Sequence, residues 1–250
     1  MVGLSDDETI DRFKEAVLYI KGHPEITNVL ISGGDPLILS TEVIHAFLDA
    51  LKTVEHLDFI RFGTRVPVVF PQRIVEDHTL VKMLGEFADN FHQLYIVTHF
   101  NHPKELTEIS ELAISRLRHA GLVINNQTVL MKGVNDDSNT LAQLMSGLLR
   151  FGINPYYVFQ CRPVKRVKQN FQLPLLEACT VVDEARTLLD GHGKRFKFVM
   201  SHESGKIEII GIMGDDIYFK QHEARNPEDI GALFKRKLHP EAGWLDDLES

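Results

Sequence analysis

The stretch from Val29 to Leu37, VLISGGDPL, joins a short apolar segment directly to two glycines and a carboxylate. The apolar half has the length and composition of a buried β-strand, and the glycine pair ends it. Because glycine carries no Cβ atom, a glycine pair at a strand end lets another group approach the backbone closely. The stretch therefore predicts a strand that ends at a binding surface made of backbone atoms.

Strand-like and helix-like segments alternate along the chain around this stretch. Strand-like segments begin near residues 28, 58, 94, 123 and 154, and helical periodicity covers 10–20, 41–53, 80–87, 106–117, 141–151 and 175–189. The interval of about 30 residues is the length of one βα unit, and short apolar strands between helices are typical of a parallel sheet. A capping box of Ser5 and Glu8 begins the first helix. The pattern predicts an α/β fold.

The pattern changes after residue 195. Segments 196–200, 206–212 and 217–219 are strand-like, and the turn residues between the last two predict a β-hairpin. The charged tail from Gln221 onward contains the only tryptophan, Trp244, and is expected to lie on the surface without a core of its own. We therefore expect a barrel in residues 1–195 and, in residues 196–250, a C-terminal strand, hairpin and tail that pack on the barrel.

The composition is that of an ordinary globular protein, with 44% hydrophobic and 25% charged residues. Its formal net charge of −8 disfavours binding to nucleic acid. No apolar run reaches the roughly 20 residues needed to cross a bilayer, and the acidic start differs from a signal peptide. We expect a cytoplasmic protein that binds neither nucleic acid nor membranes. The two cysteines, Cys161 and Cys179, are expected to be packing residues.

Polar residues follow the strand-like segments one after another. In parallel α/β sheets ligands bind at the carboxyl ends of the strands, so these residues are candidates for a site. Each group by itself is also compatible with ordinary turn chemistry, but their recurrence at one edge of the sheet indicates a binding site. The groups are residues 32–36, 63–67, 98–103, 125–127 and 160–163.

Five longer motifs resemble one family. They are GGDPL (33–37), TRVPVVFPQRI (64–74), THFNHP (98–103), NQTVLMKGVND (126–136) and PYYVFQC (155–161). In this order they are similar to the core of the lysine 2,3-aminomutase family of radical S-adenosylmethionine enzymes. The resemblance runs from about Gly3 to Cys161 and fades afterwards.

The resemblance implies a partial (β/α)6 barrel of the TIM type. In that family a 4Fe-4S cluster, reduced by an electron donor, cleaves S-adenosylmethionine to a 5′-deoxyadenosyl radical. The radical takes a hydrogen from an amino acid held on pyridoxal phosphate, and the amino group migrates from C2 to C3. By the same resemblance Ser32, Gly33, Gly34 and Asp35 would contact S-adenosylmethionine, and Arg65, His99 and Gln127 would line the cofactor cavity. Arg65 as a rim ion-pair residue and His99 as a core histidine are the alternatives.

The family's cysteine triad, Cys-x-x-x-Cys-x-x-Cys, does not occur in this sequence. The triad holds the cluster, and Cys161 and Cys179 have no spacing that replaces it. In the family it lies shortly before the segment that matches residues 2–7. We therefore expect a barrel truncated at its N-terminus, without its first strand and cluster loop. Such a chain would not bind the cluster or turn over, and its strand at 28–32 would be an exposed edge prone to aggregation.

Two further positions differ from the family. The family's imine-forming lysine follows a glycine run after a late strand, and Lys206, after Gly205, is the positional candidate here. The alternative for Lys206 is a solvated hairpin turn without pyridoxal phosphate. Lysine-specific members have an aspartate where this chain has Arg162. A cation there disfavours lysine and suits a carboxylate, so we expect an acidic amino acid such as glutamate, unless Arg162 binds a phosphate or a loop carbonyl.

Two other functions stay open from the sequence. His99, His102, Asp35 and His202 supply the ligand types of a metal-dependent TIM-barrel hydrolase. The missing cysteines are compatible with an inactive barrel fragment that only binds a partner. Whether the chain forms a homo-oligomer is also open.

Overall fold

The computed structural model describes residues 6–249, and the chain packs into two compact units. The first unit contains residues up to His99, Leu106–Asn125 and Phe151–Ile153, and the second contains the remainder. The expected helix cap at Ser5 lies outside the described residues. None of the helices in residues 6–249 is both long enough and apolar enough to cross a membrane.

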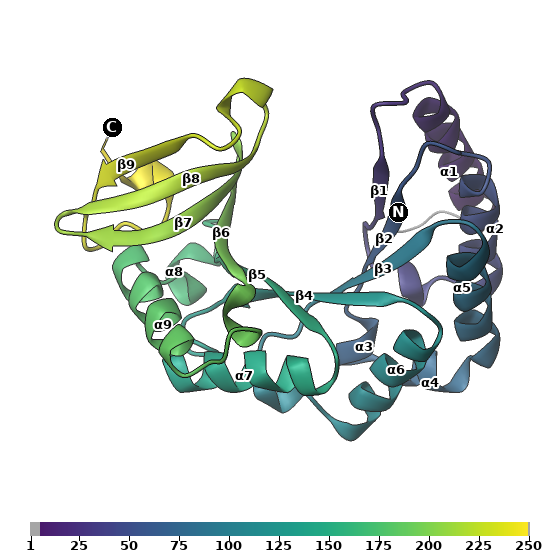
Figure 1. The fold of residues 1–250 in the computed structure, drawn as a ribbon, viewed down its shortest axis with the longest axis horizontal. Coiled ribbons are helices and arrows are strands. Elements are labelled where there is room, and N and C mark those ends of the chain that lie inside the picture. Colours follow the sequence, from purple (N-terminus) through teal and green to yellow (C-terminus); the bar gives the residue numbers. More distant parts are fainter. Residues whose placement is uncertain (1–5, 250) are drawn as a thin grey trace. The chain divides into compact units, whose positions relative to one another are not determined.

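Strands and helices alternate as the sequence predicts (Figure 1). The strands are β1 (Asn28–Ile31), β2 (Phe59–Gly63), β3 (Gln93–Thr98), β4 (Val123–Leu130), β5 (Asn154–Gln160), β6 (Lys197–His202), β7 (Gly205–Met213), β8 (Asp216–Ala224) and β9 (Leu233–Lys237). The α-helices are α1 (Asp6–Lys21), α2 (Thr41–Leu51), α3 (Val66–Val69), α4 (Gln72–Glu76), α5 (His78–Asn90), α6 (Glu108–His119), α7 (Ser138–Arg150), α8 (Lys168–Phe171) and α9 (Leu175–Thr187). The strands follow one another in the sheet in chain order.

The first unit is a parallel sheet covered by helices. Strands β1, β2 and β3 pair in parallel, so their carboxyl ends meet at one edge. Helix α2 buries Val43, Ile44, Phe47, Leu48 and Leu51, which recur at helical spacing, and α1 packs beside it. The rings of Phe13 and Phe47 stack with centroids 4.0 Å apart. The apolar faces of the helices thus cover the sheet, and the strand ends form the polar edge of this unit.

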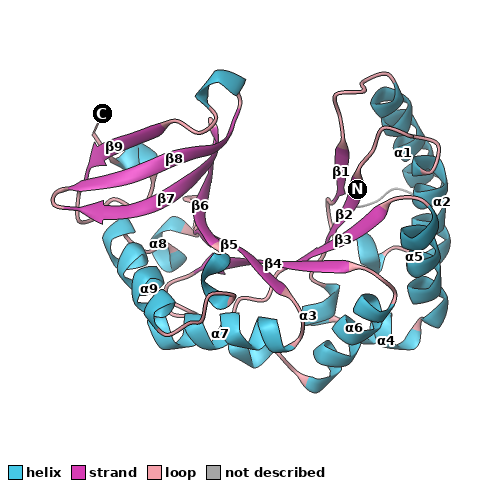
Figure 2. Cartoon of the chain, viewed as in Figure 1, coloured by secondary structure: helices cyan, strands magenta, loops and turns pink. Residues whose placement is uncertain are grey.

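The second unit changes from parallel to antiparallel pairing. Strand β5 pairs with β6 in parallel, whereas β6, β7, β8 and β9 form antiparallel pairs (Figure 2). Helices α7 and α9 pack against each other. Tyr157, Phe198 and Phe219 are fully or almost fully buried in this unit. The α/β class and the strand order of a partial (β/α) barrel, with a C-terminal hairpin, are therefore confirmed.

The expectation that the C-terminal tail only lies on the surface was wrong, because part of it forms a strand and its last residues are buried. Strand β8 extends to Ala224, and Leu233–Lys237 forms β9, which pairs with β8. Ala242, Trp244 and Leu248 are buried, with Trp244 only 5% exposed. The tail is anchored because Leu175 N donates to Ala242 O at 2.7 Å and Gln160 Nε2 donates to Gly243 O at 2.9 Å. Strand β9 has the sequence LFKRK, and three charged residues in a row on an edge strand resemble a solvated segment in sequence.

Candidate functional site

The glycine pair after β1 forms an open backbone surface. Gly33 and Gly34 have φ values of +97° and +69°, a region that L side chains rarely adopt. A Cβ atom placed on either glycine would meet no atom within 4 Å. Glycine is therefore required by the backbone conformation rather than by a neighbouring part of the protein. Ser32 is exposed beside the pair, and the backbone there is accessible to a ligand.

The carboxylate of Asp35 joins the loop after β1 to the end of β2. Its Oδ1 atom accepts hydrogen bonds from Thr64 Oγ1 at 2.5 Å and Leu37 N at 3.1 Å, and its Oδ2 atom accepts one from Arg65 N at 2.6 Å. Thr64 is buried, and its Oγ1 atom also accepts from Val66 N at 3.0 Å. Asp35 thus connects the ends of β1 and β2 through hydrogen bonds. Its Oδ2 atom, with one donor, retains capacity to accept a second hydrogen bond.

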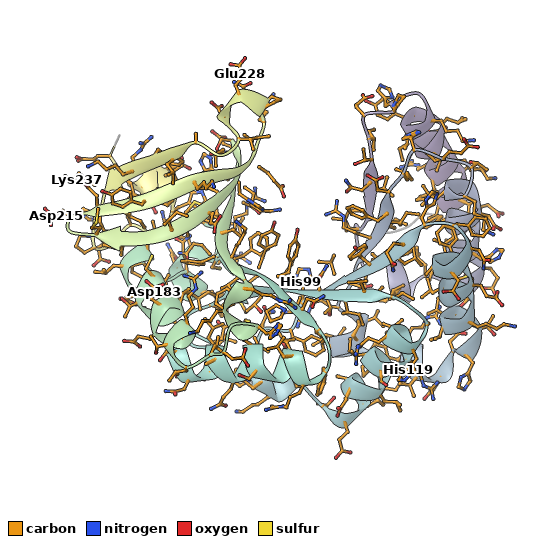
Figure 3. All side chains as sticks on the ribbon, viewed as in Figure 1. His99, His119, Asp183, Asp215, Glu228 and Lys237 are labelled. Atoms are coloured by element: carbon orange, nitrogen blue, oxygen red, sulfur yellow. The ribbon has the colours of Figure 1, made fainter. Side chains whose placement is uncertain are left out.

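His99, directly after β3, belongs to the same edge of the first unit (Figure 3). Burial lowers the pKa of His99, and the nearby Arg65 guanidinium lowers it further, while the Asp35 carboxylate has the opposite effect. The imidazole is therefore held in its uncharged form around neutral pH. The first unit thus brings together Gly33, Gly34, Asp35, Arg65 and His99, as the sequence predicts for one edge of the sheet.

In the second unit, buried amides fix the segment after β3 to β4. Asn126 is buried and exchanges two hydrogen bonds with the Phe100 backbone, at 2.7 Å from Phe100 N and 3.0 Å to Phe100 O. Asn135 Nδ2 donates to Asn101 O at 2.7 Å, and Asn101 Oδ1 accepts from Val129 N at 2.8 Å. Sequence reasoning recognised the amides only as strand-end residues and missed this structural role. Gln127, the predicted cavity residue, is half-buried on β4.

Arg162 follows β5 and is exposed. The residue before it, Cys161, is buried, and its carbonyl oxygen accepts from Gln172 Nε2 at 2.7 Å. This contact holds the backbone at the start of the Arg162 loop. Within residues 6–249 the Arg162 guanidinium has no hydrogen-bond or ion-pair partner. It is available for an anion.

Lys206 lies in β7 and not in the turn that precedes it, so its interpretation as a solvated turn residue was wrong. Its side chain is only 17% exposed, and Nζ lies 2.7 Å from Glu223 Oε1. The same ammonium lies 4.5 Å from the centroid of the Tyr157 ring. A half-buried lysine between a carboxylate and an aromatic face differs clearly from an ordinary surface lysine.

The predicted metal ligands do not form a metal site among the described residues, where no group of three His, Cys, Asp or Glu side chains has suitable geometry. His202 contacts Ser204 Oγ at 2.8 Å and Asp246 Oδ1 at 3.0 Å. His102 Nδ1 accepts from Lys104 N at 3.0 Å. Both histidines thus have local structural partners.

The residues of this chain do not fit a 4Fe-4S cluster. Cys161 and Cys179 are the only two cysteines, and both are buried. Burial raises the pKa of the Cys161 thiol and raises that of Cys179 to about 12. Iron is held by thiolates, which these two side chains do not readily form. They are packing residues, as predicted.

The fold is that of an α/β barrel-type protein, with a candidate ligand site at its strand ends. No family model matches the chain. It is 40% identical over 243 residues to a "Putative L-lysine 2,3-aminomutase" of Aquifex aeolicus and 36% identical over 191 residues to the L-lysine 2,3-aminomutase of Clostridium subterminale. It is also 40% identical over 155 residues to the glutamate 2,3-aminomutase of Clostridioides difficile. The chain belongs to the lysine 2,3-aminomutase-like family of radical S-adenosylmethionine proteins.

The alignments cover different shares of the proteins compared. They include 97%, 76% and 62% of this chain, but only 65%, 44% and 35% of the three relatives. The chain therefore spans less than two thirds of the length of these relatives. A solved radical S-adenosylmethionine methyltransferase from Sphaerobacter thermophilus matches with a TM-score of 0.49 at 16% identity, over 76% of this chain and 57% of that chain. That likeness is too low to support an argument. The family implies S-adenosylmethionine and a 4Fe-4S cluster as cofactors.

Proposed function

We propose that this chain is the barrel part of an amino acid 2,3-aminomutase that uses S-adenosylmethionine. The proposal rests chiefly on the open backbone at Gly33 and Gly34, with Asp35 clamped beside it at the carboxyl end of β1. The relatives named as lysine and glutamate 2,3-aminomutases support the reaction class. The reaction moves the amino group of an amino acid from C2 to C3.

The first unit carries the proposed contacts to S-adenosylmethionine. The backbone of Ser32, Gly33 and Gly34 would bind the methionine part of the molecule, because no Cβ atom separates the glycine amides from it. The open acceptor position on Asp35 Oδ2 suits the ammonium group of the same part. His99, uncharged, and Arg65 would line the site in the first unit. S-adenosylmethionine supplies the hydrogen-abstracting group of the reaction. No step is assigned to the cluster, because this chain has no ligands for it.

The second unit carries the proposed contacts to pyridoxal phosphate and substrate. Lys206 is the lysine that would join the cofactor, since its amine lies half-buried against the Tyr157 ring. Pyridoxal phosphate, when bound, would supply an aldehyde that reacts with amino groups. Arg162 would bind the distal carboxylate of an acidic amino acid, so glutamate is the proposed substrate in preference to lysine.

The activity is tested on the chain together with any coding sequence adjoining it in its gene, purified without oxygen and supplied with a chemical electron donor. Iron and sulfide are measured first, and deoxyadenosine and 3-amino products are then measured by mass spectrometry with glutamate or lysine. We expect about four irons per chain, cleavage of S-adenosylmethionine and a product from glutamate. Iron-free protein that still binds S-adenosylmethionine would instead support the binding-only alternative. Product from lysine alone would contradict the proposed substrate.

A further inference from the structure

The pairing of β7 with β8 contains an irregularity beside Lys206. Ile207 lies opposite Gln221, but Lys206 lies opposite Glu223, so His222 is an extra residue on β8. An extra residue of this kind is a β-bulge, which redirects side chains and occurs often next to functional sites. As a result both His222 and Glu223 contact the group of side chains around Lys206.

Four side chains from three strands form this group, called here the Lys206 cluster: Tyr157, Lys206, His222 and Glu223. Glu223 Oε1 lies 2.7 Å from Lys206 Nζ, and the Tyr157 hydroxyl lies 2.8 Å from His222 Nε2. The Lys206 ammonium lies over the Tyr157 ring rather than against its hydroxyl. The carboxylate and the aromatic face therefore hold the charged amine, whereas the hydroxyl belongs to a separate pair with His222.

The charges around the cluster favour a neutral Tyr157 and a neutral His222. Burial raises the pKa of Tyr157, and contacts with Tyr156, Glu223 and Glu208 raise it further. Burial lowers the pKa of His222, and the charges of Lys197 and Lys206 lower it further. The carboxylates of Glu223 and Glu208 raise it. Glu208 is itself paired with Lys197 at 2.6 Å. Glu223 is therefore the carboxylate that pairs directly with the Lys206 ammonium in this cluster.

We propose that Glu223 is a positioning residue that holds Lys206 as an unreactive ammonium, so that the amine reacts with an aldehyde only when this ion pair is broken. The role as a control of cofactor attachment rests on the proposed function of Lys206. In the reaction Nζ gives up a proton to solvent, and its lone pair forms the bond to the aldehyde carbon. A second amine proton and the aldehyde oxygen, with a proton returned from solvent, leave as water, and no electron transfer is involved.

The test measures the reactivity of Lys206 with two aldehydes in the 250-residue chain. Formaldehyde with cyanoborohydride measures the reactivity of the amine itself. Pyridoxal phosphate with borohydride measures attachment of the cofactor to the amine. Peptide mass spectrometry locates the modified lysine. With formaldehyde, Glu223→Gln is expected to modify Lys206 about two- to fivefold faster near pH 7, the factor expected of an ion pair whose carboxylate is largely exposed.

A matched variant separates this role from a general loss of structure. Asp216→Asn breaks the Lys235–Asp216 pair, which joins β8 to β9 at 2.6 Å, and is expected to leave the Lys206 rate unchanged. Equal formaldehyde rates for Glu223→Gln and the unaltered chain, or a slower rate at every pH, would overturn the inference. Failure of pyridoxal phosphate to modify Lys206, with the formaldehyde difference intact, would instead contradict the proposed cofactor.

Discussion

At the scale of single residues, Gly33 and Gly34 can be compared with Gly121, another glycine with a positive φ in the first unit. Gly33 and Gly34 border empty space, so the cost of a side chain there is backbone strain together with obstruction of the open surface. Gly121 in the same unit also has a positive φ, +82°, but lies between α6 and β4. A side chain at Gly34 or at Gly121 would cause a similar backbone strain, so substitutions at the two positions allow a matched comparison.

Gly34→Ala is expected to reduce the free energy of unfolding by about 1 kcal/mol, because alanine is strained in this conformation. It is also expected to weaken S-adenosylmethionine binding at least about tenfold, measured by isothermal titration calorimetry. Gly121→Ala is expected to lose similar stability with unchanged binding. Equal losses of binding in both variants would show that the glycine pair is not part of the site.

Arg162 decides the sign of the charge at the proposed substrate position. Arg162→Asp is expected to weaken binding of glutamate about tenfold or more and to improve binding of lysine, since the like-charge contact becomes an ion pair. Lys165→Asp reverses a neighbouring exposed charge and is expected to change neither affinity. The proposed substrate class would be contradicted if the chain bound glutamate and lysine equally well and if Arg162→Asp changed neither affinity.

At the scale of elements, Asp77 connects three helices of the first unit. It caps α5 by accepting from Leu80 N at 2.8 Å, and it accepts from Thr41 Oγ1 of α2 at 2.6 Å and from Arg73 of α4. Burial raises the pKa of Asp77, but these hydrogen bonds and the Arg73 charge outweigh it and bring the pKa to about 2. Arg73 belongs to the motif at 64–74, whose resemblance to the family thus includes a structural residue.

The lowered pKa predicts how stability depends on pH. The Asp77 carboxylate stabilises the fold above its unfolded pKa of about 4, and this contribution is lost as the pH falls through about 2. Asp77→Asn is expected to cost about 1 to 2 kcal/mol near pH 7, a value reduced by solvent screening, and almost nothing near pH 2. Urea denaturation at several pH values measures the difference. A cost that does not change with pH would assign the effect to the helix cap alone.

The C-terminal segment around Trp244 contributes core to the second unit. Trp244→Ala is expected to cost about 3 to 5 kcal/mol, the usual cost of removing a buried aromatic side chain. Chemical denaturation followed by circular dichroism measures the loss. Truncation of exposed Leu233, 69% exposed on β9, is expected to cost less than about 0.5 kcal/mol. Similar small costs for both changes would mean that the tail is only loosely attached.

At the scale of the whole molecule, the sheet has a free edge at β1. Within the described residues β1 pairs only with β2, and Leu30 on this strand is 48% exposed. An apolar edge strand is a template for pairing with another chain. The net charge of −8 opposes association.

We expect the 250-residue chain to aggregate as its concentration increases. Leu30→Lys is expected to reduce aggregation severalfold in light scattering, because a charge on an edge strand disfavours further pairing. Leu18→Lys changes an equally apolar residue on α1, 68% exposed, and is expected to have a smaller effect. A monodisperse, cooperatively unfolding monomer would contradict the expectation.

The sequence by itself determined the order and type of nearly all the elements, because apolar periodicity is a local property that follows from burial on one face. Short helices such as α3 and α4, and strand β9, were not predicted, since their apolar patterns are too short or too charged. The strand-end position of Gly33, Asp35 and His99 was predictable for the same local reason, combined with the rule that parallel strands end at one edge.

Only the tertiary structure decided which partners these side chains have. Asp35 is held by Thr64 and Arg65, and Lys206 by Glu223 and Tyr157, through contacts between residues far apart in the chain. A β-bulge shifts the register of β8 by one residue, and no local pattern in the sequence marks it. Register and packing depend on the whole sheet at once, so the chemical environment of a residue is known only when its neighbours are in place.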